Sequence, residues 1–341
     1  MNQKLFAASG IFLLAVALLA GKLGTASPPA SPPGTKILAA AAEVFEALSE
    51  KERAKALVDY QSRERFDWQF IPKERKGIPV KELEPAVRAK VQTLLAASLS
   101  EKGAKLVQTV MSHEDILREI EGAQRKFPRD PLLYHLTFFS RPSRQGPWGY
   151  SFEGHHLSVN VTLEGDRLLS ASPLFYGANP AIVRDGPQKG LRILGGVEDL
   201  ARDLVRSLKE PERKACLGEE GGVVPEEVPA GKESVPYKGP LPAGVAADSL
   251  GEEARAKLAE LIAQYTGNLP PEIAQGVLES GLKGVRVAWR GSLEPYQPHS
   301  YLVHGPGFVI NYTNTQNGAA HVHSCFRTLK GEFGLPPESK G

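Results

Sequence analysis

Two short histidine-containing stretches are the segments of this sequence whose residue types could support chemistry. The first is GHHLSVNVTL at 154–163, and the second is HVHSCFR at 321–327. Together they carry four of the chain's eight histidines, which are His155, His156, His321 and His323. Neutral imidazole is a ligand for zinc, copper and iron, so the two stretches predict a site for an unknown divalent metal from this group.

The first stretch has one polar row of side chains. If residues 153–163 form a single strand, successive side chains point to opposite faces of the sheet. His155 then shares a face with apolar residues, namely Leu157, Val159, Val161 and Leu163. His156 shares the other face with Ser158, Asn160 and Thr162. This alternation predicts that His156 projects from a polar face.

The second stretch repeats the arrangement. Its odd positions are His321, His323, Cys325 and Arg327, and Val322 and Phe326 lie opposite. If both apolar faces turn to the core, His156, His321 and His323 project from the same side. A His-x-His pair places its Cα atoms roughly 6.5–7 Å apart, within reach of one ion. Three histidines leave an open coordination position, which suits water activation by zinc or oxygen chemistry by copper or iron.

Two charged residues beside the histidines are candidates for catalytic roles. Arg327 is expected either to orient an anionic substrate or to be a strand-end charge. Glu153 is a candidate general base, although alternation puts it on the face of His155. A bulge at Gly154 would reset that register, so His155 stays among the candidate ligands.

The histidine pattern leaves three hypotheses open. The first is a metal-dependent hydrolase or oxidase, and the second is a non-catalytic extracytoplasmic module that binds a metal or small ligand. The third is purely structural, since strand histidines also hydrogen-bond within sheets. His304 is a candidate extra ligand, whereas His113 and His135 are expected at the surface or in the core.

The chain's periodicity predicts which elements position these residues. Apolar residues at three-to-four spacing predict helices at about 36–60, 82–101 and 102–121, and alternating strands begin at Leu132. Helical and then strand patterns return after a Gly- and Pro-rich loop or linker at 217–249. We therefore expect an α+β fold, with an antiparallel sheet assembled from two strand groups and helices packed on one face. Trp68, Phe70 and Pro72 are expected in a loop that plugs the core.

The N-terminal segment predicts export. Residues 1–26 combine a positive start, an apolar run and small residues, which is typical of a signal peptide or an N-terminal anchor. Residues 27–35 form a Pro-rich spacer, and 36–341 is expected to be a single domain. Two cysteines remain for an oxidising compartment, Cys216 and Cys325, and their predicted positions argue against pairing.

Composition and missing motifs exclude several functions. The chain is 41% hydrophobic and 23% charged with a net charge of +2, as in a folded globular protein. It has no basic stripe with interleaved aromatic residues, so we expect no nucleic-acid partner, and membrane contact is expected only through an uncleaved N-terminal segment. Phosphate-binding loops, serine-hydrolase elbows and His-Glu-x-x-His helices are not present. The expected partner is an unknown small molecule.

Several segments in a fixed order resemble one known family. WQFIP, GPWGYSFEGHHLSVNVTL, SPLFYGANPA, YLVHGPGFVINYTNTQN and HVHSCFR are similar to the family catalogued as domain of unknown function 3500, over about residues 40–334. The resemblance implies no established activity, but it groups the two histidine stretches. Asn311 and Thr328 stand where the family pattern commonly has acids, which would matter if those acids are ligands or bases in relatives.

Overall fold

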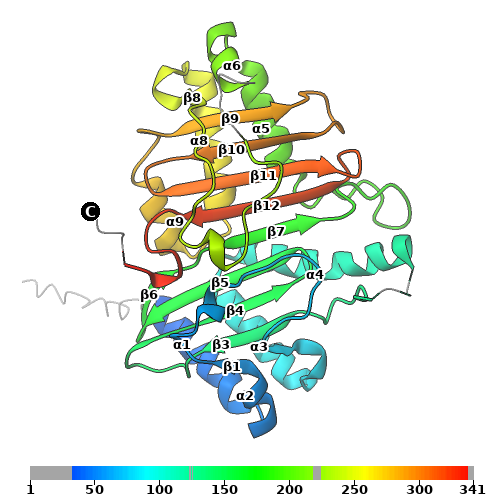
Figure 1. Cartoon of the computed structure of the whole chain (residues 1–341), viewed down its shortest axis with the longest axis vertical. Coiled ribbons are helices and arrows are strands. Elements are labelled where there is room, and N and C mark those ends of the chain that lie inside the picture. The colour runs from blue at the N-terminus through cyan, green and yellow to red at the C-terminus, as the bar shows by residue number, and fades with distance from the viewer. Residues whose placement is uncertain (1–32, 123, 125, 218–223, 337–341) are drawn as a thin grey trace, which may run out of the picture. The chain divides into compact units, whose positions relative to one another are not determined.

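Strands from both parts of the chain join one sheet in the computed structural model, which describes residues 33–122, 124, 126–217 and 224–336. The strands are β1 (Leu57–Val58), β2 (Ile78–Pro79), β3 (His135–Phe139), β4 (Pro147–Gly154), β5 (Leu157–Glu164), β6 (Arg167–Ser170), β7 (Leu174–Ala178), β8 (Val245–Ala246), β9 (Arg286–Gly291), β10 (His299–His304), β11 (Phe308–Gln316) and β12 (His321–Thr328). Their order is β1-β3-β4-β5-β7-β12-β11-β10-β9-β8, with β2 beside β3 and β6 beside β5 (Figure 1).

The two strand groups meet in the middle of this sheet. β7 is the last strand of the first group along the path, and it pairs with β12 of the second group. Pairs along the path are antiparallel except for β1 and β3, which run parallel. The α+β class predicted from the sequence is therefore confirmed, and the sheet is mixed rather than purely antiparallel.

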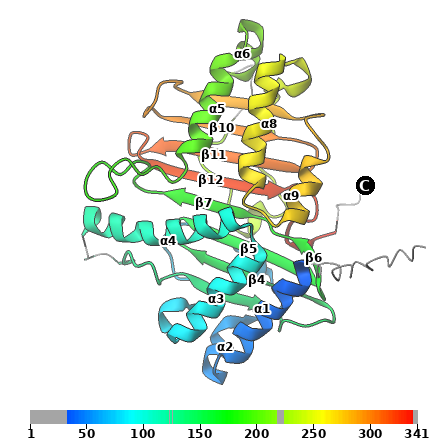
Figure 2. The ribbon, with the colours of Figure 1, turned by 180° about the vertical axis from the view of Figure 1, so that it is seen from behind.

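Helices lie in front of the sheet in the view of Figure 2. They are α1 (Pro33–Ala47), α2 (Glu50–Ala56), α3 (Pro85–Ser98), α4 (Glu101–Glu121), α5 (Gly195–Ser207), α6 (Glu210–Cys216), α8 (Glu252–Thr266) and α9 (Pro271–Leu278). The helix predicted at 36–60 is two helices, because Ser49 and Glu52 form a capping box that starts α2. In α4, Val107, Val110 and Leu117 are buried at the predicted spacing, and Val107 and Val110 join the main core.

Two long connecting segments cross the sheet in the opposite view (Figure 1). One lies between β1 and β2, and its Trp68 and Phe70 are buried against Phe175 and Cys325. The expectation that Trp68 and Phe70 plug the core is confirmed. The other is the described part of the predicted loop or linker at 217–249, where Val228 packs into the same cluster. That segment is a covering loop, because its apolar side chains bury against the sheet.

The N-terminal predictions fall mostly outside the described residues. Residues 1–32 are not described, so the signal peptide or anchor and most of the 27–35 spacer lie beyond the structure. The last residues of the expected spacer, 33–35, belong to α1, which begins at Pro33. Residues 32–341 group into one unit. No helix in the described ranges combines the length and the apolar character needed to span a membrane.

Both cysteine thiols are free and buried. Cys216, at the end of α6, belongs to the main core cluster that includes the helices. Cys325 belongs to the smaller cluster around Trp68 on the loop-covered face. The two residues therefore lie in different layers of the fold, in agreement with the expectation against pairing.

Candidate metal centre

A two-residue turn interrupts the strand that the sequence predicts at 153–163. β4 ends at Gly154 and β5 begins at Leu157, and these two residues are paired. His155 and His156 form the turn between them, so the alternation that placed His155 on the face of Leu157 does not apply. The sequence does not signal this turn, because the turn lacks the Asn-Gly or Asp-Gly pair that usually signals a hairpin.

Three backbone features hold His156 in place. Its φ is 60°, a left-handed value that is uncommon for residues other than glycine. Its N–H donates to the Phe70 carbonyl at 2.9 Å, and its own carbonyl accepts from Gly177 N–H at 2.8 Å. The turn is thus fixed both to the covering loop and to β7. Left-handed residues of this kind are enriched at functional sites.

Gly177 gives the His156 ring its position. A Cβ atom at this residue would lie 2.8 Å from His156 Cδ2, so only glycine leaves room for the imidazole. In the β7–β12 register, Gly177 is the partner of His323. The ring of His156 therefore lies beside the first residues of β12.

The structure brings three of the predicted ligands together. His156 Nε2 lies 2.7 Å from His321 Nε2, and His323 Nε2 lies 3.1 Å from that same atom. A ligand atom from each of the three residues can be chosen so that all lie within 4.8 Å of one another. The site is therefore formed by the β4–β5 turn and the start of β12, at the boundary between the two strand groups.

Burial lowers the pKa of two of these imidazoles, His156 and His321. His156 is 3% exposed and His323 is 4% exposed, whereas His321 is partly exposed. Burial, followed by the neighbouring His323, lowers the pKa of His321 to about 4. Burial and the adjacent histidines hold the pKa of His156 well below its usual value. At neutral pH the rings of His156 and His321 are therefore unprotonated, which is the form that binds a metal.

A carboxylate from the covering loop orients His323. Glu227 Oε1 and Oε2 each lie 2.8 Å from His323 Nδ1, which leaves Nε2 facing the other histidines. The rings of Phe70 and Phe175 pack against His323 at centroid distances of 4.7 and 5.6 Å. This arrangement matches the carboxylate–histidine pairs that fix ring orientation in metal sites.

His155 belongs to an adjoining acid–imidazole pair. Its ring stacks on that of His156 at 3.7 Å, and its Nδ1 lies 2.6 Å from Glu114 Oε1 and 3.3 Å from Arg129 Nη1. Burial raises the pKa of Glu114 to about 8, and burial with Arg129 lowers the pKa of His155. The stable form at neutral pH is a protonated Glu114 that donates to a neutral His155. Glu114, His155 and His156 make a second group with metal-ligating spacing.

A small cavity adjoins this pair. It has a volume of about 210 Å³, and its lining includes Arg75, Arg129, Glu114 and His155. Arg75 donates to the Gly154 carbonyl at 3.0 Å, so it is anchored to the same turn. Two guanidinium groups thus face a cavity next to the histidines.

Arg327 occupies a different position from the one expected. It is fully buried, and its Nε and Nη2 donate to the two oxygens of Glu332 at 2.7 and 2.6 Å. Its remaining N–H groups donate to the Pro229 carbonyl and to the hydroxyl and carbonyl of Ser234. All five donors of the guanidinium are engaged, so none is left to orient a substrate.

Glu153 also lies outside both histidine groups. Its Oε1 accepts from Ser158 Oγ at 3.1 Å, and its Oε2 lies 3.8 Å from Lys76 Nζ. It borders another cavity, of about 190 Å³, together with Asp67 and other charged residues. Gly154 contains no bulge that would turn Glu153 toward His156, because the turn begins directly after it.

The other histidines are separate from the centre. His304 on β10 has its Nε2 2.9 Å from the Pro242 carbonyl, and His113 on α4 has its Nε2 3.0 Å from the Pro180 carbonyl. His135 lies on β3. His304 is therefore not brought to the predicted ligands, and His113 is a buried core residue as one of the two alternatives expected.

Sequence reasoning missed Glu114 and Glu227. Glu114 lies three residues before Leu117 and four after Val110, so the helical period places it on the buried face of α4. An acid on an apolar helix face was a signal that could have found it. Glu227 carried no comparable signal, because its segment has no periodicity and its position depends on how the loop folds.

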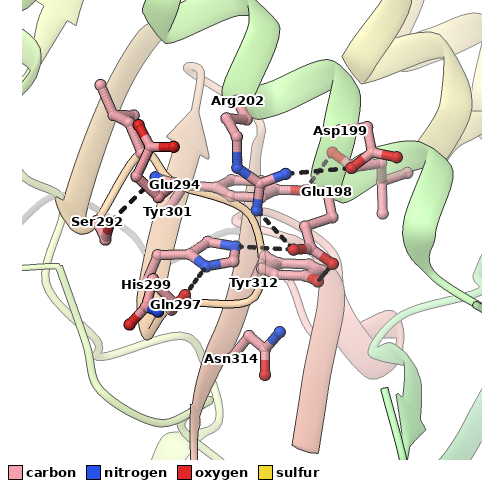
Figure 3. Close-up of polar contacts among 12 residues, drawn as sticks. Glu198, Asp199, Arg202, Ser292, Glu294, Gln297, His299, Tyr301, Tyr312 and Asn314 are labelled. Carbon is pink, nitrogen blue, oxygen red and sulfur yellow. Dashed lines mark hydrogen bonds and ion pairs between the residues drawn. The ribbon is translucent and has the colours of Figure 1, made fainter. Parts of the chain in front are cut away.

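A second buried polar cluster, also missed, surrounds Glu198 of α5 (Figure 3). Glu198 on α5 accepts from Arg202 Nη2 at 2.6 Å and from the Tyr312 hydroxyl at 3.1 Å. His299 Nε2 lies 3.7 Å from Glu198, and the His299 ring stacks between those of Trp289 and Tyr312. The cluster joins α5 to β10 and β11, which carry His299 and Tyr312.

Comparison with known proteins places the two histidine stretches within one family. The family model described as protein of unknown function (DUF3500) matches residues 31–335, which includes every residue of the centre. No curated protein and no solved structure shows a significant match to the chain. The chain therefore belongs to the DUF3500 family.

Proposed function

We propose that this protein is an exported metal-binding protein whose centre consists of His156, His321 and His323. The observation that carries the proposal is the convergence of three imidazole nitrogens, 2.7 and 3.1 Å apart, from segments distant in the sequence. Two nitrogens that each lie about 2.1 Å from one ion are roughly 3.0–3.4 Å apart, so a small outward shift of His156 accommodates an ion. Zinc, copper and iron all suit three imidazoles.

The layers of the fold support this assignment. We take the helices to be packed on one face of the sheet, where they provide a rigid support. The centre then belongs to the opposite face, beneath the two covering loops that supply Phe70 and Glu227. Rigid strands and a carboxylate on the outer ring nitrogen are the usual supports of a metal-binding histidine.

Hydrolysis of a small anionic substrate is the chemistry that the surroundings of the centre support best. The bound metal would supply an activated water. Arg75 lines the adjoining cavity and would bind the anionic group of the substrate, the role that the sequence assigned to Arg327. Arg129 lines the same cavity, but its Nε is ion-paired with Glu121 at 2.7 Å. Glu114, protonated and hydrogen-bonded to His155, would donate a proton to the leaving group.

Metal content is the first test. The purified protein is loaded separately with Zn²⁺, Cu²⁺ and Fe²⁺, and bound metal is measured by elemental mass spectrometry. We expect about one ion per chain in the wild type and in the matched control His304→Ala, and near-complete loss in His321→Ala/His323→Ala. If none of the three metals is retained by the folded wild type, the metal centre is rejected.

A non-catalytic metal carrier is the second candidate, favoured by the low exposure of His156 and His323. The two functions differ in turnover. The zinc-loaded protein is assayed with small ester and phosphoester substrates beside Glu114→Gln, and the copper- and iron-loaded forms are assayed for oxygen consumption. Metal binding without turnover in either assay would assign the carrier function. Export is tested separately, by the N-terminus of the protein recovered from its native cell.

A further inference from the structure

A larger cavity, of about 360 Å³, is lined by residues of β7 and of β12, the strand that carries His321 and His323. Tyr176 on β7 and Ser324 on β12 line it and are partners in the strand register. Tyr176 is followed by Gly177, which lies against the His156 ring, and Ser324 is preceded by His323. Because neighbouring residues in a strand point to opposite faces, the cavity and the centre lie back to back across the sheet.

The interior of this cavity is mainly apolar. Apolar side chains from α4, the segment before α5 and the two strands line it, including Leu106, Leu174, Ile193, Leu194, Val197 and Phe326. Its volume lies in the range of small-molecule sites, about 300–1,000 Å³. A ligand that fills it must therefore present an apolar body.

The charged residues of the lining are all basic. Lys102, Lys105 and Arg192 border the cavity, and its lining includes no Asp or Glu. Arg192 is neutralised, because it donates to the carboxylates of Glu198 and Asp199, which are both labelled in Figure 3. Its charge is therefore not available to a ligand.

Lys102 and Lys105 differ from Arg192 in the partners of their charged groups. Lys102 Nζ donates to the backbone and side-chain oxygens of Gln264 at 2.9 and 2.6 Å, and both acceptors are uncharged. Within the described part of the chain, no carboxylate forms an ion pair with Lys102 or Lys105. The mouth of the cavity thus carries two uncompensated positive charges, which favour an anionic group on the ligand.

The start of α5 adds to this potential. Gly196 and Val197 line the cavity and lie in the first turn of α5, which has no side-chain cap. N–H groups in the first turn have no acceptor within the helix, and the helix dipole is positive at this end. Gly196 has open space where a Cβ atom would lie, so the backbone is approachable there.

An unpaired polar atom marks a further contact. Asn268 lines the cavity and is 6% exposed, and among the described residues its Oδ1 has no hydrogen-bond partner. Its Nδ2 donates to the Gln264 carbonyl at 3.3 Å, which fixes the orientation of the amide. A buried acceptor without a partner costs free energy, and a hydroxyl group on the ligand would satisfy it.

We infer that this cavity binds an amphipathic carboxylate, with its apolar body between α4 and the segment before α5, its carboxylate at Lys102 and Lys105, and a hydroxyl group on Asn268. The site is independent of the proposed metal centre, since no residue is shared between them.

Calorimetric titration of the full-length chain with 3-hydroxyoctanoate tests the inference. We expect saturable binding of one molecule per chain. Octanoate should bind on the order of fivefold more weakly, the loss of one hydrogen bond worth about 1 kcal/mol. Octylamine, which carries the opposite charge, should not bind. Equal affinity for octanoate and octylamine would overturn the assignment of an anionic ligand.

Two variants test the charge directly. Lys102→Gln/Lys105→Gln should weaken octanoate binding roughly three- to tenfold, as expected for two partly exposed ion pairs, and should leave 1-octanol binding unchanged. The matched control is Lys51→Gln/Lys283→Gln, which removes two exposed lysines far from the lining. An unchanged octanoate affinity in the first variant would overturn the proposed carboxylate position.

Two further variants test the location. Leu106→Trp should fill the cavity and abolish binding, with folding checked by circular dichroism. Asn268→Ala should remove the advantage of 3-hydroxyoctanoate over octanoate without changing the octanoate affinity. Full binding by a folded Leu106→Trp protein would show that the ligand binds elsewhere and would overturn the inference, whatever the outcome of the metal experiments.

Discussion

The Nε2 atoms of His156 and His321 lie 2.7 Å apart, although 165 residues separate the two in the chain. His321 Nε2 also faces His323 Nε2 at 3.1 Å. A neutral ring nitrogen carries either one hydrogen or one lone pair, so the nitrogen of His321 cannot be a donor to one neighbour and an acceptor from the other. A cation between the three nitrogens satisfies all of them at once.

Gly177→Ala should displace His156 from this arrangement. The added methyl group would lie 2.8 Å from the His156 ring, and the ring must move because the strand backbone cannot. We expect at least about tenfold weaker zinc binding and a loss of about 1–3 kcal/mol in the free energy of unfolding. A competition titration with a zinc-sensitive dye measures the affinity.

The control for this substitution is Gly196→Ala, where the new methyl group meets no atom within 4 Å. It should leave zinc affinity unchanged. Wild-type affinity in Gly177→Ala would mean that His156 is not a ligand.

Glu227→Gln should weaken metal binding without abolishing it. Glu227 holds Nδ1 of His323, and the loss of such a supporting carboxylate typically lowers metal affinity about 10–100-fold. Zinc competition is again the measurement, beside Glu226→Gln as the matched control, since Glu226 is exposed and contacts Arg290. Equal affinities in the two variants would remove Glu227 from the centre.

Arg327→Gln should act on stability and not on the metal. It leaves the buried carboxylate of Glu332 without its partner, which costs about 3–5 kcal/mol. Denaturant unfolding measures this loss, and the folded fraction should bind zinc as the wild type does. Arg206→Gln breaks an exposed ion pair and should cost no more than about 1 kcal/mol. A stable Arg327→Gln protein with impaired ligand binding would restore the functional role predicted from the sequence.

His135 should make the protein less stable in acid. Burial lowers the pKa of His135 to about 4, whereas an unfolded histidine titrates near 6.5. Between about pH 6.5 and pH 4 the unfolded chain binds a proton that the folded chain does not, so stability falls as the pH falls through this window. After allowance for the exposed part of the ring, the loss is about 1–2 kcal/mol.

His135→Gln should flatten this dependence. Urea unfolding at pH 7 and at pH 4.5 gives the difference in unfolding free energy, which should be smaller in the variant than in the wild type. Identical differences in the two proteins would show that His135 titrates alike in the folded and unfolded chain.

Strand alternation predicted much of the loop-covered face from the sequence. Ser158, Asn160 and the odd positions of β12 share that face because the period of a strand is two residues in any context. Their burial was not predictable, since it depends on two loops without periodicity. The Nδ2 of Asn160, for example, donates to Ser158 Oγ and to the Pro173 carbonyl.

The differences between the predicted and observed positions of His155 and Arg327 also have local causes. The turn at His155 and His156 carries no glycine, so an unbroken strand fitted the apolar pattern equally well. The sequence predicts a strand-end charge or a substrate contact for Arg327. It does not reveal the partner Glu332, because Glu332 reaches Arg327 only after the chain reverses at Gly331, whose φ is 73°. Long-range placement of this kind depends on tertiary packing and not on residue spacing.

The boundary between β7 and β12 divides the proposed ligands between two lengths of polypeptide. The part of the chain up to Ala178 contributes His156, and the part that follows contributes His321 and His323. Neither length alone would hold the ion, so metal occupancy would report that both halves of the sheet have joined. Two separately expressed fragments would then recover tight metal binding only when they reassociate, and the bound ion would stabilise the complex of the two fragments.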